Sequence, residues 1–145
     1  MMDYETVPAA DFGRALGGVS VNLLVRDVAA TVAFLRGVFG MRAYRVSADF
    51  AIMEHGGALF QLHADPTYHD NPLPSLLPEA GPRGGGVEIR LHEADPDAAC
   101  AAAAGFPGFV VLRGPSDRPH GLREAYLLSP DGYAFVPSRR LPVAT

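Results

Sequence analysis

The segment SVNLLVRDVAATVAFLRGVFG, residues Ser20–Gly40, decides the fold because a second segment repeats its pattern. The second segment, EIRLHEADPDAACAAAAGFPG, runs over Glu88–Gly108, and the two align without a gap. Each begins with apolar and polar residues in alternation, which is typical of a half-buried strand. Each continues with an aspartate and a helical stretch that stops near glycine. The chain is therefore predicted to contain two copies of one strand–helix unit.

The predicted helices have recognisable starts. Asp27 and Asp95 occupy equivalent places, just before the helical stretches. A short carboxylate there can accept hydrogen bonds from the first free N–H groups of a helix. Pro96 follows Asp95 directly, and proline is favoured at the first helical position. We therefore expect both aspartates to be N-caps.

The repeat continues beyond the helices. HGGALFQLHAD, residues 55–65, resembles PDGYAFVPSRR, residues 130–140, and the stretches between them and the helices read as further strands and turns. Each half is thus strand–helix–strand–strand–strand, or βαβββ. We predict a single domain over residues 1–145, with repeat one at about 17–64, a Pro- and Gly-rich linker at about 65–84, and repeat two at about 85–140. A linker of this length inside a domain is usually functional or mobile.

The alternation also predicts which side chains share a face, because successive residues of a strand point to opposite sides. One helix can cover only one face of its sheet, so two units that share or close a sheet would leave a concave face. The face toward the helices is expected to carry Val19, Val21, Leu23, Val25, Val87, Ile89 and Leu91. The concave face is expected to carry Ser20, Asn22, Leu24, Gln61, His63, Glu88, Arg90, His92, Glu124 and Tyr126. Converging polar groups in a partly apolar groove favour a ligand site, although antiparallel sheets often turn such a face to solvent.

Composition narrows the classes of function. The hydrophobic fraction of 48% allows a real core, and the net charge of −4 without a basic run argues against a nucleic-acid partner. No apolar stretch approaches the roughly 20 residues that cross a bilayer, so no membrane partner is expected. The single cysteine, Cys100, cannot form an intrachain disulfide. A cytoplasmic location fits these features.

Two motifs give the chain a family resemblance. VRDVAATVAFLRGVFGM in the first half and REAYLLSPDGYAF in the second, together with the βαβββ repeat, resemble the vicinal oxygen chelate superfamily. That superfamily includes glyoxalase I, extradiol dioxygenases and bleomycin-resistance proteins, and the resemblance covers about residues 17–140. It implies an α+β fold in which the two repeats form a U-shaped, partly closed, eight-stranded mixed sheet around a concave ligand groove.

The resemblance also implies four metal-ligand positions on the concave face, usually held by His, Glu or Gln. Here they map to Ser20, Gln61, Glu88 and Val136. Valine offers no donor and serine is a poor neutral ligand, so no metal and no other cofactor is expected. A displaced site built from Glu88, His92 and His63 is the open alternative, with zinc, nickel, manganese or iron as the metal.

Two functions remain open. The first is a metal-independent binding protein similar to the bleomycin-resistance branch, holding a small organic molecule in the groove and forming a homodimer. The second is a metal-dependent lyase, isomerase or dioxygenase with an atypical ligand set. A metal-free enzyme could instead use Glu88 as a general base. The metal content of the purified protein would separate the binding protein from the metal enzyme.

Overall fold

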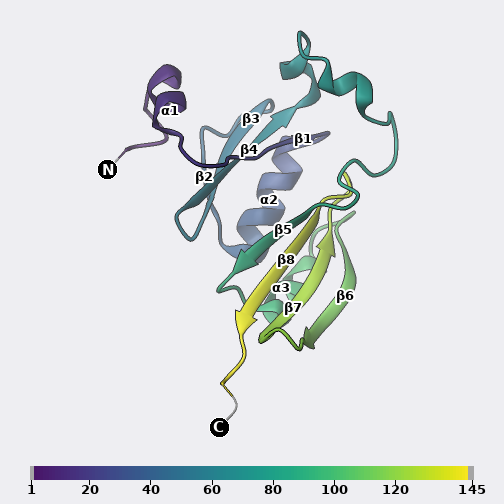
Figure 1. Cartoon of the computed structure of the whole chain (residues 1–145). Coiled ribbons are helices and arrows are strands. Elements are labelled where there is room, and N and C mark those ends of the chain that lie inside the picture. Colours follow the sequence, from purple (N-terminus) through teal and green to yellow (C-terminus); the bar gives the residue numbers. More distant parts are fainter. Residues whose placement is uncertain (1, 144–145) are drawn as a thin grey trace. The chain divides into compact units, whose positions relative to one another are not determined.

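The computed structural model describes residues 2–143 and has an α+β fold (Figure 1). The chain forms two compact units. The first contains the chain up to Ala33 and Met41–Ser75; the second contains Phe34–Gly40 and the chain from Leu76 onward. Over residues 2–143, no helix is long and apolar enough to span a bilayer.

The first unit is built on a four-stranded mixed sheet. Its strand order is β1-β4-β3-β2, with β1 parallel to β4 and the other neighbours antiparallel. A short helix precedes the sheet, and a longer helix follows its first strand and extends into the second unit. The elements are α1 (Ala9–Ala15), β1 (Asn22–Val25), α2 (Val28–Phe39), β2 (Arg42–Tyr44), β3 (Phe50–His55) and β4 (Ala58–Ala64).

The second unit repeats this plan. Its sheet has the order β5-β8-β7-β6, again with a parallel first pair and antiparallel neighbours. Its elements are β5 (Glu88–His92), α3 (Pro96–Ala103), β6 (Val110–Asp117), β7 (Leu122–Leu128) and β8 (Ala134–Arg140). The linker between the repeats contains two 3-10 helices, η1 (Asp65–Tyr68) and η2 (Leu73–Leu76). Both βαβββ repeats are thus confirmed; closure of the sheets into one U-shaped sheet stays a prediction, as does the single domain.

The helix starts agree with the sequence. The Asp95 side chain accepts hydrogen bonds from the N–H groups of Asp97 and Ala98, and Pro96 is the first helical residue. Asp27 caps α2 by accepting from the N–H of Ala30 at 2.9 Å. After α2, Gly40 has φ +65°, a left-handed conformation that stops a helix.

The cores of the two units differ in composition. The first sheet buries aliphatic residues, among them Leu23, Val25, Leu62, Ala51 and Met53. The second unit has an aromatic cluster in which the Phe34 ring stacks on Phe109 with centroids 3.9 Å apart. The cluster is completed by Phe39, Phe106 and Phe135. Aromatic pairs of this kind add stability beyond the area they bury.

Three expected side-chain placements, next to the first strand of each repeat, are wrong. Val19, Val21 and Val87 were expected in the core but are 92%, 40% and 45% exposed, because they precede Asn22 and Glu88, where β1 and β5 begin. Leu24 lies beside His63 on the face of Asn22, as expected, although it is only 2% exposed. The helix α1 was not predicted. This helix covers part of one face of the first unit's sheet, and the alternation of residues in β1 alone could not predict that cover.

Candidate ligand site

The polar face expected for the second repeat is present. Arg90 of β5 lies opposite Val136 of β8, and Glu124 of β7 lies opposite Ser138 of β8. Residues two apart on a strand share a face, so Glu88, Arg90, Glu124 and Tyr126 lie on one side of this sheet. On the opposite side, Arg123 hydrogen bonds to Asp97 of α3. The predicted division between a helix-covered face and a polar face is therefore correct here.

An ion-pair network occupies this polar face. An Oε2 atom of Glu124 accepts from Arg90 Nη2 at 2.5 Å and lies 3.2 Å from His120 Nε2. Arg90 Nη1 also lies 3.5 Å from Glu88 Oε2. The Glu124 side chain is 5% exposed, whereas that of Glu88 is 39% exposed. Glu124 is therefore the structural anchor of the network, and Glu88 is its accessible member.

The network changes the proton affinity of two of its members. Burial acts to raise the pKa of Glu124, but hydrogen bonds from Arg90 and His120 outweigh it, and the pKa lies below its usual 4.5. A hydrogen bond with Glu88 raises the pKa of Tyr126, so the phenol stays protonated at neutral pH. His92 lies beside them in sequence but bonds through Nδ1 to Ser138 Oγ at 2.9 Å. A role for Glu88 as a general base stays a prediction.

The corresponding face of the first sheet carries Asn22, Gln61 and His63. Gln61 lies between Asn22 of β1 and Ile52 of β3, and His63 lies next to Phe50 of β3. This confirms that the three predicted residues share a face within the first unit. That they meet the polar face of the second repeat in one groove stays a prediction.

His63 is enclosed by aromatic rings. The ring centroids of Phe50 and Tyr68 each lie 5.0 Å from the centroid of the His63 ring, in edge-to-face arrangements. The Tyr68 hydroxyl accepts from Asn22 Nδ2 at 3.1 Å, which ties η1 to β1. Burial lowers the pKa of His63, so the ring is neutral at pH 7. Its Nε2 atom is buried and has no hydrogen-bond partner among the residues described.

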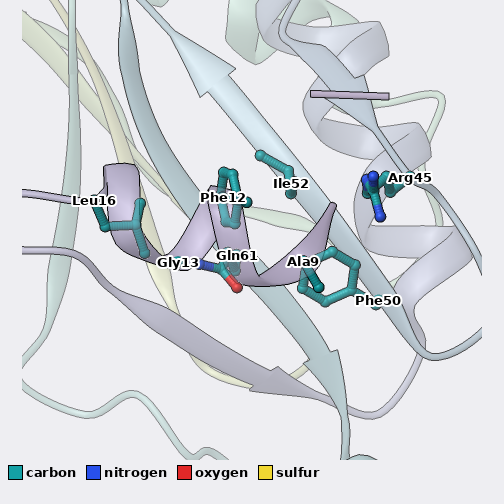
Figure 2. A pocket seen from close by; sticks show the side chains of 8 residues that line it. All are labelled: Ala9, Phe12, Gly13, Leu16, Arg45, Phe50, Ile52 and Gln61. Atoms are coloured by element: carbon teal, nitrogen blue, oxygen red, sulfur yellow. The ribbon is translucent and has the colours of Figure 1, made fainter. Parts of the chain in front are cut away.

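A cavity of about 310 Å³ lies between α1 and this face of the first sheet (Figure 2). Figure 2 shows α1 crossing over the sheet, with Gln61 beneath Gly13 and the Phe12 side chain beside Ile52. The lining is apolar except for one amide and one guanidinium. It consists of Ala9, Phe12, Gly13, Leu16, Arg45, Phe50, Ile52 and Gln61.

Sequence reasoning found only Gln61 among the lining residues. One missed signal is the spacing of Ala9, Phe12 and Leu16, which places three apolar residues on one side of a helix. In the structure Phe12 is 9% exposed, and it is the one buried residue of α1. No local sequence pattern predicts that Arg45 lines the cavity, because its position depends on a left-handed backbone conformation with φ +53°.

The four positions that the family resemblance assigns to a metal have different surroundings. Gln61 lines the cavity beneath α1, and Ser20 lines a separate cavity of about 280 Å³ with Leu59. Glu88 is part of the ion-pair network, and Val136 is fully buried. Within residues 2–143, no three His, Cys, Asp or Glu side chains lie close enough to hold a metal ion. Valine offers no donor and serine is a poor neutral ligand, so these four residues do not fit the family's metal.

Comparison with known proteins identifies the family of this chain. The family model described as "Glyoxalase/Bleomycin resistance protein/Dioxygenase superfamily" matches residues 19–136. A search of curated proteins found no match. Many solved structures share the fold.

Three similar solved structures illustrate that fold. A glyoxalase/bleomycin resistance protein/dioxygenase family enzyme from Burkholderia phytofirmans PsJN is 21% identical, with a TM-score of 0.69 over 84% of this chain and 97% of that one. A glyoxalase-related enzyme from Fulvimarina pelagi is 17% identical, with a TM-score of 0.66 over 86% and 89%. TioX from Micromonospora sp. ML1 is 19% identical, with a TM-score of 0.58 over 86% and 100%. At these identities the similarity shows the fold alone.

Proposed function

Because the chain belongs to the glyoxalase/bleomycin resistance protein/dioxygenase superfamily, we propose that it is a metal-independent binding protein for a small organic molecule. The ligand occupies the cavity between α1 and the first sheet. The observation that carries this proposal is the cavity itself, apolar on most sides and supplied with the Gln61 amide. The homodimer and the cytoplasmic location remain predictions.

The chemistry of the cavity suits a compact organic ligand. Its volume of about 310 Å³ lies at the lower end of the range for small-molecule sites. The walls formed by Phe12, Phe50 and Ile52 favour apolar or aromatic surface, because burying such surface releases water. Gln61 can both donate and accept a hydrogen bond, which fixes the orientation of a ligand with one polar group. Binding by these residues needs no covalent step.

The polar face of the second repeat offers polar groups but no cavity of its own among those described here. Arg90 is held in the ion pair with Glu124, while Glu88 and Tyr126 form the more accessible part of this face. A polar molecule could hydrogen bond to that pair without breaking the buried ion pair. We therefore assign the binding free energy to the cavity and expect Glu88→Gln to leave the binding of fragments in the cavity unchanged.

A variant that fills the cavity tests this function. A side chain at Gly13 would start in open space, since a Cβ there meets no atom within 4 Å. Gly13→Leu should therefore fill the cavity without disturbing α1. In a ligand-observed NMR screen of aromatic and aliphatic fragments, those that bind the wild type should bind Gly13→Leu at least about tenfold more weakly, since the leucine displaces apolar contact area.

The matched control is Ala10→Leu, which adds the same side chain to the exposed side of the same helix. It should bind the same fragments as the wild type. If no fragment binds the wild type, or if Gly13→Leu binds the same fragments equally well, the proposed site is wrong.

A further inference from the structure

We propose that the ligand of the cavity is a small aromatic carboxylate whose carboxyl group pairs with Arg45. This inference rests on the proposed function and adds the chemical class of the ligand. It follows from the lining, in which Arg45 is the one charged residue. A carboxylate suits this half-buried guanidinium, whose hydrogen-bond partners Tyr4 and Val7 are neutral carbonyls, because hydrogen bonds between two charged groups are the stronger ones.

Arg45 is held in place by the N-terminal segment. Its Nε atom donates to the Tyr4 carbonyl at 2.9 Å, and its Nη2 atom donates to the Val7 carbonyl. These two partners are neutral, so they fix the guanidinium without cancelling its charge. A guanidinium has five N–H donors, so the two bonds leave others for a carboxylate. Arginine is suited to this role because its planar fork matches the geometry of a carboxylate.

One acidic group lies close by. Glu5 accepts from the backbone N–H of Arg45 through Oε1 at 3.1 Å. Its contact is with the backbone, so it does not occupy the guanidinium. Its negative charge nevertheless opposes the approach of an anionic ligand. Glu5 is therefore a means of changing the field at the site without altering Arg45.

The other lining residues define the body of the ligand. Phe12 and Phe50 offer aromatic faces, and Ile52 offers an aliphatic wall. The cavity of 310 Å³ corresponds to about ten waters' share of liquid volume, which is the size of a one- or two-ring molecule. A ring system of that size with a carboxylate at one end would place the ring between the phenylalanines. Gln61 would then hold a second polar substituent.

The N-terminal segment offers a way in. α1 buries only Phe12, and the glycines Gly17 and Gly18 follow it, with Gly18 at φ +63°. At the other end Tyr4 packs on Phe12 and Tyr44, and Arg45 holds the segment by its carbonyls. Movement of this segment would open the cavity, while a carboxylate pairs with the N–H groups of Arg45 that the two carbonyls leave free.

A pair of shape-matched compounds tests the inference. 2-Naphthoate and 2-naphthamide have the same ring and nearly the same shape, but only the first is an anion. Isothermal titration calorimetry at pH 7 should show 2-naphthoate binding the wild type about tenfold more tightly, as a charge-assisted hydrogen bond is about twice as strong as a neutral one. In Arg45→Met this preference should vanish. In Glu5→Gln it should grow by about twofold, since a nearby like charge is removed.

Each result decides the matter. Equal binding of both compounds by the wild type would overturn the carboxylate class while leaving the proposed function standing. Retention of the naphthoate preference in Arg45→Met would remove Arg45 from the site. If Arg45→Met does not fold, an unchanged ratio in Glu5→Gln overturns the inference. A further outcome is that neither naphthalene compound binds the wild type, while other fragments bind the wild type and lose affinity for Gly13→Leu. The carboxylate class is then wrong and the cavity remains a site.

Discussion

Gly132→Ala is expected to lower the free energy of unfolding by about 3 kcal/mol. Two causes combine at this position. Gly132 has φ +86°, and a Cβ there would lie 2.5 Å from Pro82 Cβ and 2.8 Å from Pro82 Cα. The second contact is with backbone, so it cannot be relieved by rotating a side chain. The turn before β8 is also fixed by the Gly132 N–H, which donates to the Ser129 carbonyl at 2.9 Å.

The first repeat supplies a matched control. Gly57 is the equivalent turn glycine and has φ +82°, but a Cβ there meets no atom within 4 Å. Gly57→Ala should therefore cost only the strain of the left-handed backbone, about 1 kcal/mol. Urea denaturation of both variants and the wild type measures the difference. Equal destabilisation by the two substitutions would show that the close approach of Pro82 to Gly132 is absent in solution.

Arg90→Met is expected to lower the free energy of unfolding by about 2 kcal/mol, because it leaves the carboxylate of Glu124 buried without its main partner. The usual loss for a fully buried pair is larger, about 3–5 kcal/mol. The estimate is reduced because Arg90 is 29% exposed and His120 remains beside Glu124. Glu88→Gln, at the exposed end of the network, should change stability little. The double variant Arg90→Met with Glu124→Leu should recover most of the loss.

The same substitution has a definite pH dependence. In the wild type the pKa of Glu124 lies below 4.5, so its contribution to stability is present above that pH and is lost as the pH falls through the folded-state value. Without Arg90, burial dominates and raises the pKa of Glu124. The folded variant then takes up a proton more readily than the unfolded chain, and acid relieves its defect. The stability difference between wild type and Arg90→Met should therefore shrink as the pH falls from 7 toward 4; a constant difference would show that Glu124 is not the cause.

The sequence predicted the repeat well because its signals are local. Strand alternation, the aspartates Asp27 and Asp95 and the proline at 96 each act over a few residues, and the structure has the expected elements. The alternation of residues along each strand correctly predicted that Glu88, Arg90, Glu124 and Tyr126 share one face. The prediction failed at Val19, Val21 and Val87, because alternation gives the direction of a side chain but not the residue at which a strand begins.

The cavity could not be predicted in the same way. It depends on a seven-residue helix that is too short to be stable alone and is held by contacts from residues far along the chain. Arg45 reaches it through a left-handed backbone that arginine rarely adopts. Phe50 and Ile52 belong to a strand whose face is fixed only by pairing with β4. Such a site appears when separate elements pack together.

The measurement that tests the central claim most directly is the location of a bound fragment. With a wild-type binder from the fragment screen, intermolecular NOEs can be recorded to the methyl groups of Ile52 and Leu16 and to the ring of Phe12. The account predicts NOEs from the fragment to all three residues, which line the cavity, and their loss in Gly13→Leu. NOEs confined to residues outside this lining, with Ile52 silent, would contradict it.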